Sequence, residues 1–138
     1  MTVTAYRLAL ADALSAMFPD APVGPHPPPT PRGGTGYLRP ARERPWMDYR
    51  ATGATWCNPA VSIDLVLIAP QSLGQSPQAW LWLEDRTVDL QAGLQGAPAL
   101  SSGHKTPRLL TVGSPGVLDA GTGLLAAEYE LSSVFIGV

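Results

Sequence analysis

The stretch AVSIDLVLIAP, residues 60–70, is the strongest strand pattern in the chain. Every second residue is apolar and is expected to point to one buried face of a sheet; these residues are Val61, Ile63, Leu65 and Leu67. Ser62 and Asp64 begin the opposite face, which becomes apolar at Val66 and Ile68. The pattern therefore predicts a strand that is covered on both faces toward its end.

The next segment, QSPQAWLWLEDRTVDLQAGLQG at residues 75–96, predicts a helix. Ser76 suits the N-cap, and Pro77 suits the first helical position, where its missing N–H is no loss. One stripe of residues recurs at a spacing of three and four and is expected to face the sheet: Trp80, Leu83, Thr87, Leu90 and Leu94. Gly93 or Gly96 is expected to end the helix in the left-handed conformation.

Two further segments complete the predicted fold. Residues 2–18 place apolar side chains on one helical face, at Val3, Tyr6, Leu10, Leu14 and Met17. Residues 107–138 predict two strands joined around DAGTG, in which Glu128 and Glu130 form a solvated face. We therefore predict one α+β domain over residues 1–138. An N-terminal and a central helix pack on its mainly antiparallel sheet, and it carries a long Pro/Gly-rich loop.

That loop contains GPHPPPTPRGGTG, residues 24–36, where proline and glycine exclude a regular helix or central strand. It is either a dispensable linker or a built arm, and an arm over about residues 22–45 is favoured because only a short helix precedes it. The following segment, YLRPARERPWMDYR at residues 37–50, is rich in arginine and is expected to be extended or an edge strand. We interpret it as a basic interaction surface; the alternative is a solvated edge protected by its charges.

Several residues of these segments are candidates for contact with another protein. Trp82 lies off the buried stripe of its helix, so we interpret it as an exposed contact residue, with packing beneath a loop as the alternative. The apolar end VFIGV, residues 134–138, is expected to be covered by the helices or by a neighbouring subunit. The interaction candidates are Pro27, Pro28, Pro29, Arg32, Arg39, Arg42, Arg44, Trp46, Trp82 and Phe135.

Composition and motifs argue against an enzyme. Only 14% of the residues are charged, against about 25% in an average soluble domain, so part of the surface is expected to be covered by protein, unless Pro/Gly-rich loops displace the charged residues. Cys57, His26 and His104 lack the spacing of a zinc site, and we expect no metal or cofactor. Ser102 and His104 lie together in SSGHK, and a small hydrolase built on them is the enzymatic alternative.

Charge and hydropathy also limit the location and partners. A net charge of -2 argues against general nucleic-acid binding. The longest nearly apolar run, residues 65–70, is far shorter than the roughly 20 residues that cross a bilayer. The N-terminal segment lacks a basic leader, so we expect a soluble protein of intracellular origin without membrane contact.

The order of segments resembles the tail terminator, or tail completion, proteins of long-tailed bacteriophages. It runs from an amphipathic helix and long loop through AVSIDLVLIAP and a Trp-bearing helix to a hairpin that ends AAEYELSSVFIGV. The resemblance implies a structural virion protein that forms a homo-hexameric ring on the tail tube and stops polymerisation of the major tail protein. It also implies binding to a head-tail connector or stopper protein. Genomic DNA would pass through the lumen without sequence recognition.

The resemblance also implies a location in the virion tail or neck, and in the host cytoplasm during assembly. In that setting, the arm and the arginines after it would reach a neighbouring subunit, the tube or the head-side partner. The alternatives are another neck or minor tail component, such as a head-tail connector, and a monomeric module that presents its prolines as a polyproline II ligand.

Overall fold

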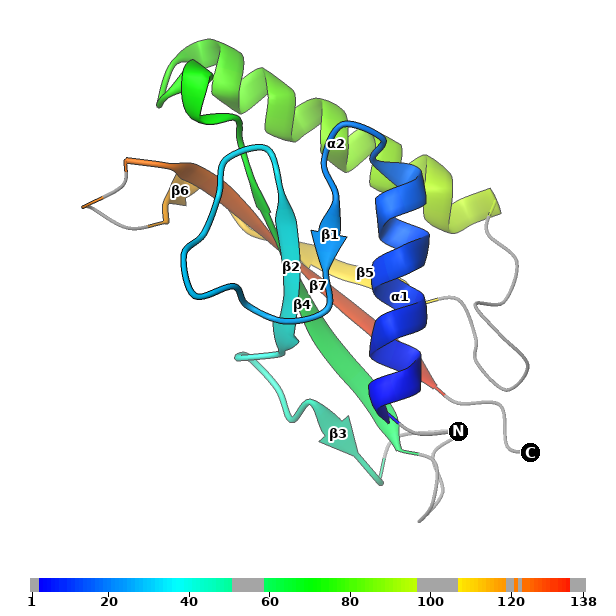
Figure 1. The fold of residues 1–138 in the computed structure, drawn as a ribbon. Coiled ribbons are helices and arrows are strands. Elements are labelled where there is room, and N and C mark those ends of the chain that lie inside the picture. Colours follow the sequence, from blue (N-terminus) through cyan, green and yellow to red (C-terminus); the bar gives the residue numbers. More distant parts are fainter. Residues whose placement is uncertain (1–2, 51–58, 97–106, 119–120, 122, 135–138) are drawn as a thin grey trace.

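The computed structural model describes residues 3–50, 59–96, 107–118, 121 and 123–134. Figure 1 shows two helices and a twisted sheet. The elements are α1 (Val3–Met17), β1 (Val23–Gly24), β2 (Gly36–Pro40), β3 (Met47–Asp48), β4 (Ala60–Ile68), a 3-10 turn (Gln71–Leu73), α2 (Pro77–Gly96), β5 (Arg108–Val112), β6 (Gly116–Val117) and β7 (Leu125–Val134).

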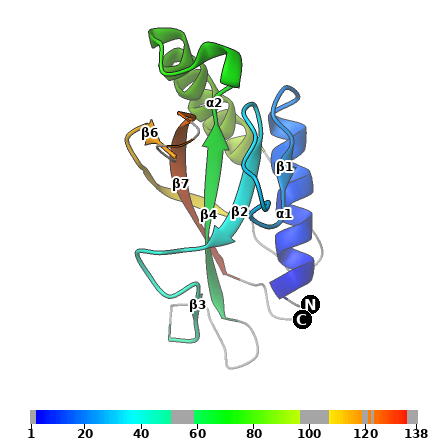
Figure 2. The same ribbon diagram turned by 60° about the vertical axis from the view of Figure 1, so that its left-hand side comes forward.

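The strands form one seven-stranded sheet with the order β1-β2-β4-β7-β5, while β3 pairs with β4 and β6 pairs with β7. All pairings are antiparallel except that of β1 with β2. Both helices cover the same face of this sheet (Figures 1 and 2). The predicted α+β class, with two helices on a mainly antiparallel sheet, is confirmed.

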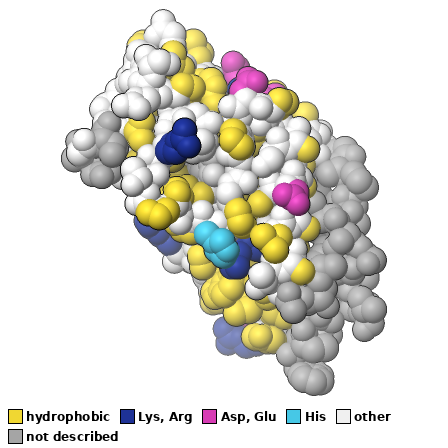
Figure 3. Space-filling model, in the orientation of Figure 1, with side chains coloured by type: hydrophobic (Ala, Val, Ile, Leu, Met, Phe, Trp, Pro, Cys, Tyr) yellow, Lys and Arg dark blue, Asp and Glu magenta, His cyan; other side chains and the backbone are white. Residues whose placement is uncertain are grey.

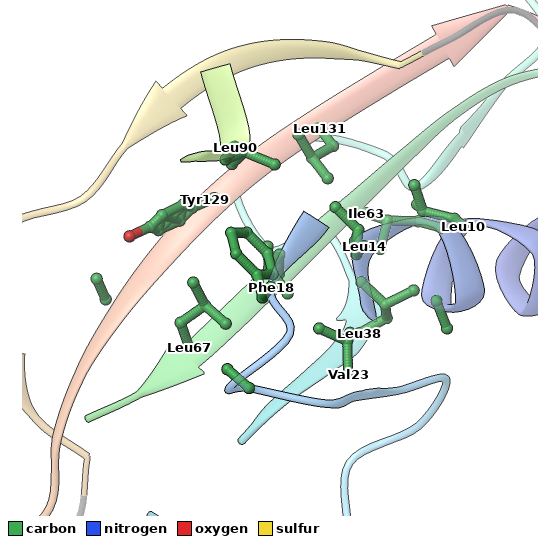
Figure 4. Close-up of a cluster of buried hydrophobic side chains, with 14 of the residues drawn as sticks. Leu10, Leu14, Phe18, Val23, Leu38, Ile63, Leu67, Leu90, Tyr129 and Leu131 are labelled. Atoms are coloured by element: carbon green, nitrogen blue, oxygen red, sulfur yellow. The ribbon is translucent and has the colours of Figure 1, made fainter. Parts of the chain in front are cut away.

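The main core lies between the two helices and the sheet. The four alternating residues of β4 all point into it, as the period of two predicts, and so do Leu10 and Leu14 of α1 and Leu90 of α2. Figure 4 shows Ile63 and Leu67 of β4 with the three helix leucines around Phe18, which follows α1 and is 1% exposed. Tyr129 of β7 closes the core beneath α2, where its hydroxyl lies 2.8 Å from Thr87 Oγ1.

The helix α2 begins at Pro77 as expected and ends at Gly96, one of its two predicted end positions, but the side chain of Ser76 does not cap it. The Ser76 carbonyl accepts the first helical bond from Ala79, while its hydroxyl donates to the Leu73 carbonyl instead of capping the helix. The helix runs through Gly93, where a Cβ would lie 2.6 Å from Met17 Sδ, so this glycine allows α1 and α2 to approach closely.

The expected exposures of Trp80 and Trp82 were wrong. Trp80 was expected to face the sheet, but it is 42% exposed beside a hollow of about 260 Å³ that Val112 and Tyr129 also line. The pairing of β5 with β7 changes register between Leu109 and Thr111, close to this hollow. Trp82 was expected to be exposed, but it is half-buried against the main core.

The segments that flank β4 and β7 follow the predicted patterns. Residues 37–50 form β2 and β3, which pair in turn with the same edge of β4, with residues 41–46 looping out between them. Residues 25–35 contain neither helix nor strand. The strands β6 and β7 are joined around DAGTG, where Leu118 N–H donates to the Leu124 carbonyl over 2.8 Å.

Phe135, Cys57, Ser102 and His104 lie outside the described residues.

Candidate interaction surface

The face of the sheet that points away from the helices carries charged side chains at matched positions. The register places Arg39 of β2 opposite Asp64 of β4, and Asp64 opposite Glu130 of β7. Thr111 of β5 lies opposite Glu130 in turn, and its hydroxyl donates to Glu130 Oε2 over 3.4 Å. One row of polar residues therefore crosses four strands, and we call this side of the sheet the open face.

These charges form a network of ion pairs. Arg39 Nε lies 3.4 Å from Asp64 Oδ2, and Arg39 Nη2 lies 2.7 Å from Glu128 Oε1. Arg44 reaches over the face and pairs with Glu130. Arg39, Asp64 and Glu130 are only 9%, 6% and 5% exposed. The expected solvated face at Glu130 and the alternative of a solvated edge at Arg39 are therefore wrong, because each side chain is enclosed by charged partners from other segments.

Burial and pairing shift the pKa values of this network. Removal from water raises the pKa of Asp64, although the Arg39 charge and the backbone N–H of Arg42 act in the opposite direction. Burial would lower the pKa of Arg39, but the hydrogen bond and charge of Glu128 outweigh it and raise that pKa. The network thus holds a permanently charged arginine against a carboxyl that is less acidic than usual.

Two hollows lie beside the network on the open face. One, of about 530 Å³, is lined by Tyr37, Arg39, Arg42 and Glu128 together with Pro31, residues 113–114 and residues 116–118. The other, of about 490 Å³, is lined by Pro31, Arg32 and Leu124 among others. Both border the second apolar cluster, which consists of Tyr37, Val66, Ile68, Leu124 and Ala126. Because they share Pro31, we call the two hollows together the open-face trough.

The structure brings the four candidate arginines to this face. Arg32 and Arg42 are exposed and line the trough, and within the described part of the chain neither guanidinium makes an ion pair. Arg39 lines the trough as well, and Arg44 pairs with Glu130 outside its lining. Three of the four candidate arginines, Arg32, Arg39 and Arg42, therefore border one hollowed surface.

The remaining candidates lie elsewhere. Pro27 and Pro29 are exposed and Pro28 is half-buried, and neither hollow of the trough is lined by them. Trp46 is half-buried against the main core, and its carbonyl accepts the Ser62 N–H over 2.8 Å. The guanidinium carbon of Arg86 lies over the Trp82 ring, 5.3 Å from the ring centroid. The two tryptophans are therefore mainly packing residues.

The sequence reasoning missed Asp64, Glu128 and Glu130 as members of this surface. Each sits on the non-core face of a predicted strand, and that alternation was the available signal. Their pairing with Arg39 depends on strand register, which the patterns within single strands do not determine.

The described residues hold little that resembles a catalytic centre. They contain no group of three or more side chains able to hold a metal ion, and His26 is exposed on the loop after β1. Neither described helix is long and apolar enough to cross a membrane. Comparison of the chain with protein-family models and with curated proteins gives no match.

Proposed function

We propose that this protein is a tail terminator of a long-tailed bacteriophage, a structural virion protein that caps the tail tube as a homo-hexameric ring. The observation that carries the proposal is the presence of two unlike surfaces on opposite sides of one subunit. The open face offers a charged trough, and the outer side of the helix layer exposes apolar residues of α2. Unlike surfaces that join head to tail generate rings when the rotation closes.

The segment order of the chain supports the same function through its resemblance to tail terminators. In this role the ring stops polymerisation of the major tail protein and binds a head-tail connector or stopper protein on its other side. The net charge of -2 suits a lumen through which genomic DNA slides without sequence recognition. The protein would reside in the tail or neck of the virion, and in the host cytoplasm during assembly.

The test is a polymerisation assay with the major tail protein encoded by the same genome. We expect addition of this protein to yield tubes of limited length with a ring on one end in negative-stain electron micrographs. Tubes of unchanged length without rings would contradict the proposal. Rings found on isolated head-side connectors but never on tubes would instead identify another neck component.

A further inference from the structure

The outer face of α2 has a chemistry that complements the open-face trough. Leu81 and Val88 are 56% and 62% exposed, and Glu84 and Asp85 are exposed between them. At 100° per residue all four lie on one side of the helix, opposite the buried Leu83. Figure 3 shows acidic side chains over α2 at the top of the view. This face is therefore apolar and acidic, and it is not covered by the described parts of the chain.

The trough presents the opposite combination. Two of its exposed charges, Arg32 and Arg42, lack carboxylate partners among the residues that the structure describes, whereas its exposed carboxylate, Glu128, is already paired with Arg39. Leu118 and Ala126 border its apolar floor, and Val117, 47% exposed, forms part of its wall. A surface that supplies carboxylates beside two aliphatic side chains would satisfy both features.

We propose that the outer face of α2 of one copy docks into the open-face trough of a second copy, and that this is the repeated contact of the ring. The inference rests on the proposed function, which requires a ring. Glu84 and Asp85 pair with Arg32 and Arg42 of the next copy, while Leu81 and Val88 cover its apolar floor. Charge complementarity of this kind fixes the orientation of the partners and speeds their encounter.

The placement of the two surfaces allows each copy to use both at once. The outer side of α2 points away from the sheet, and the trough lies on the far side of that sheet (Figures 1 and 2). Because the two patches lie on opposite sides of a copy, two copies cannot each dock into the other at once, and each added copy leaves one further surface free. Closure of the chain of copies then gives a ring.

The test reverses the charges on one surface at a time. One variant carries Arg32→Glu with Arg42→Glu, a second carries Glu84→Arg with Asp85→Arg, and a third combines all four changes. We measure self-association of the purified full chain by sedimentation velocity over a range of concentrations. We expect each single-surface variant to weaken association at least about tenfold, and the combined variant to regain most of it, because opposite charges again face each other.

Matched controls reverse exposed charges outside the two surfaces. Arg50→Glu changes a side chain that is 91% exposed, and Asp12→Arg changes an exposed position on α1. Both are expected to associate like the wild type, and thermal unfolding shows that each variant is folded. A monomeric wild type, or single-surface variants that associate normally, would overturn the proposed contact.

Two outcomes separate this inference from the function on which it rests. Restored association in the combined variant, with tubes of unchanged length, would support the contact and contradict the terminator function. If the variant with Arg32→Glu and Arg42→Glu formed normal rings on tubes but no longer bound the head-side connector, the proposed docking between copies would be overturned. That second result would assign the trough to an acidic segment of the connector.

Discussion

Asp64 is a buried carboxyl whose surroundings make it less acidic than usual, and this has a consequence for stability. Its pKa is raised in the folded protein, because loss of hydration outweighs the attraction of Arg39. At a pH between the pKa of Asp64 in the unfolded chain and its higher pKa in the folded protein, the folded state binds more protons than the unfolded state. The contribution of Asp64 to stability is therefore fully present below the unfolded pKa and is lost as the pH rises through the folded pKa.

Replacement of Asp64 by Asn removes this titration. We expect Asp64→Asn to become more stable relative to wild type as the pH increases from about 3 to 7, so that its free energy of unfolding rises against that of the wild type. Urea unfolding at several pH values measures the difference, with Asp12→Asn as an exposed control. A relative stability that decreases over this range would show that the attraction of Arg39 dominates burial.

Arg39 is the partner on which the buried charges depend. Arg39→Met leaves Asp64 buried without its adjacent cation, which we expect to destabilise the fold by about 3 kcal/mol. The double variant Arg39→Met, Asp64→Leu should recover most of that loss, since no uncompensated charge remains on β4. Arg42→Ala, at an exposed position, should change the free energy of unfolding by less than about 0.5 kcal/mol. Equal effects of the Arg39 and Arg42 changes would contradict the difference in burial.

Tyr6 makes the fold sensitive to alkaline pH. Burial raises its pKa to about 12, although its hydrogen bond with Ser133 over 2.5 Å acts in the other direction. The unfolded chain ionises near pH 10, so stability is present below that pH and is lost at about 1.4 kcal/mol per pH unit as the pH rises toward 12. Tyr6→Phe should reduce this alkaline loss in guanidinium unfolding, while costing about 1 kcal/mol at pH 7.

At the scale of elements, the Pro/Gly-rich loop is anchored where Gly33 passes the end of β4. A Cβ at Gly33 would lie 2.5 Å from the backbone nitrogen of Gln71. Gly33→Ala must therefore displace backbone, and we expect a loss of about 1–3 kcal/mol in thermal or urea unfolding. Gly116→Ala is the control, because nothing lies within 4 Å of its added methyl group. Similar stability of both variants would mean that the loop is free to move away from Gln71.

The predictable elements are those whose packing is periodic along the chain. Alternation over residues 61–68 located β4 and identified both of its faces correctly, including the change from polar to apolar on the open face. The 3.6 period located α1 and α2. It did not predict correctly which of Trp80 and Trp82 is buried. The apolar stripe of α2 continues over a hollow beside Trp80, and that hollow depends on the irregular pairing of β5.

The candidate surface was only partly predictable, for a related reason. The arginines were recognisable from residues 32–44 alone. The burial of Arg39 depends on carboxylates supplied by β4 and β7, and the trough depends on the residues of the β5–β6 connection that wall it. These contacts bring together segments that are far apart in the sequence, and composition or spacing does not reveal them.

At the scale of the whole molecule, the proposed contact between copies should respond to salt. Its charge pairs lie at the rim of an interface, where added ions screen them over about 10 Å at 0.1 M ionic strength. We expect self-association to weaken several-fold between about 0.05 and 0.5 M sodium chloride, measured by light scattering at fixed protein concentration. Association that strengthens with salt would indicate a contact dominated by apolar residues such as Leu81 and Val88.

The position of β7 also determines when the chain is able to fold. This strand follows every other element among the described residues, yet it lies between β4 and β5 and pairs with β4 from Ala60↔Val134 to Ile68↔Ala126. During synthesis, β4 therefore waits with an unpaired apolar edge until residues 125–134 have left the ribosome. Such an edge favours pairing with other nascent chains, and non-local strand pairing is slow. A lower expression level, which keeps fewer incomplete chains together in the cell, should therefore raise the soluble yield of this protein.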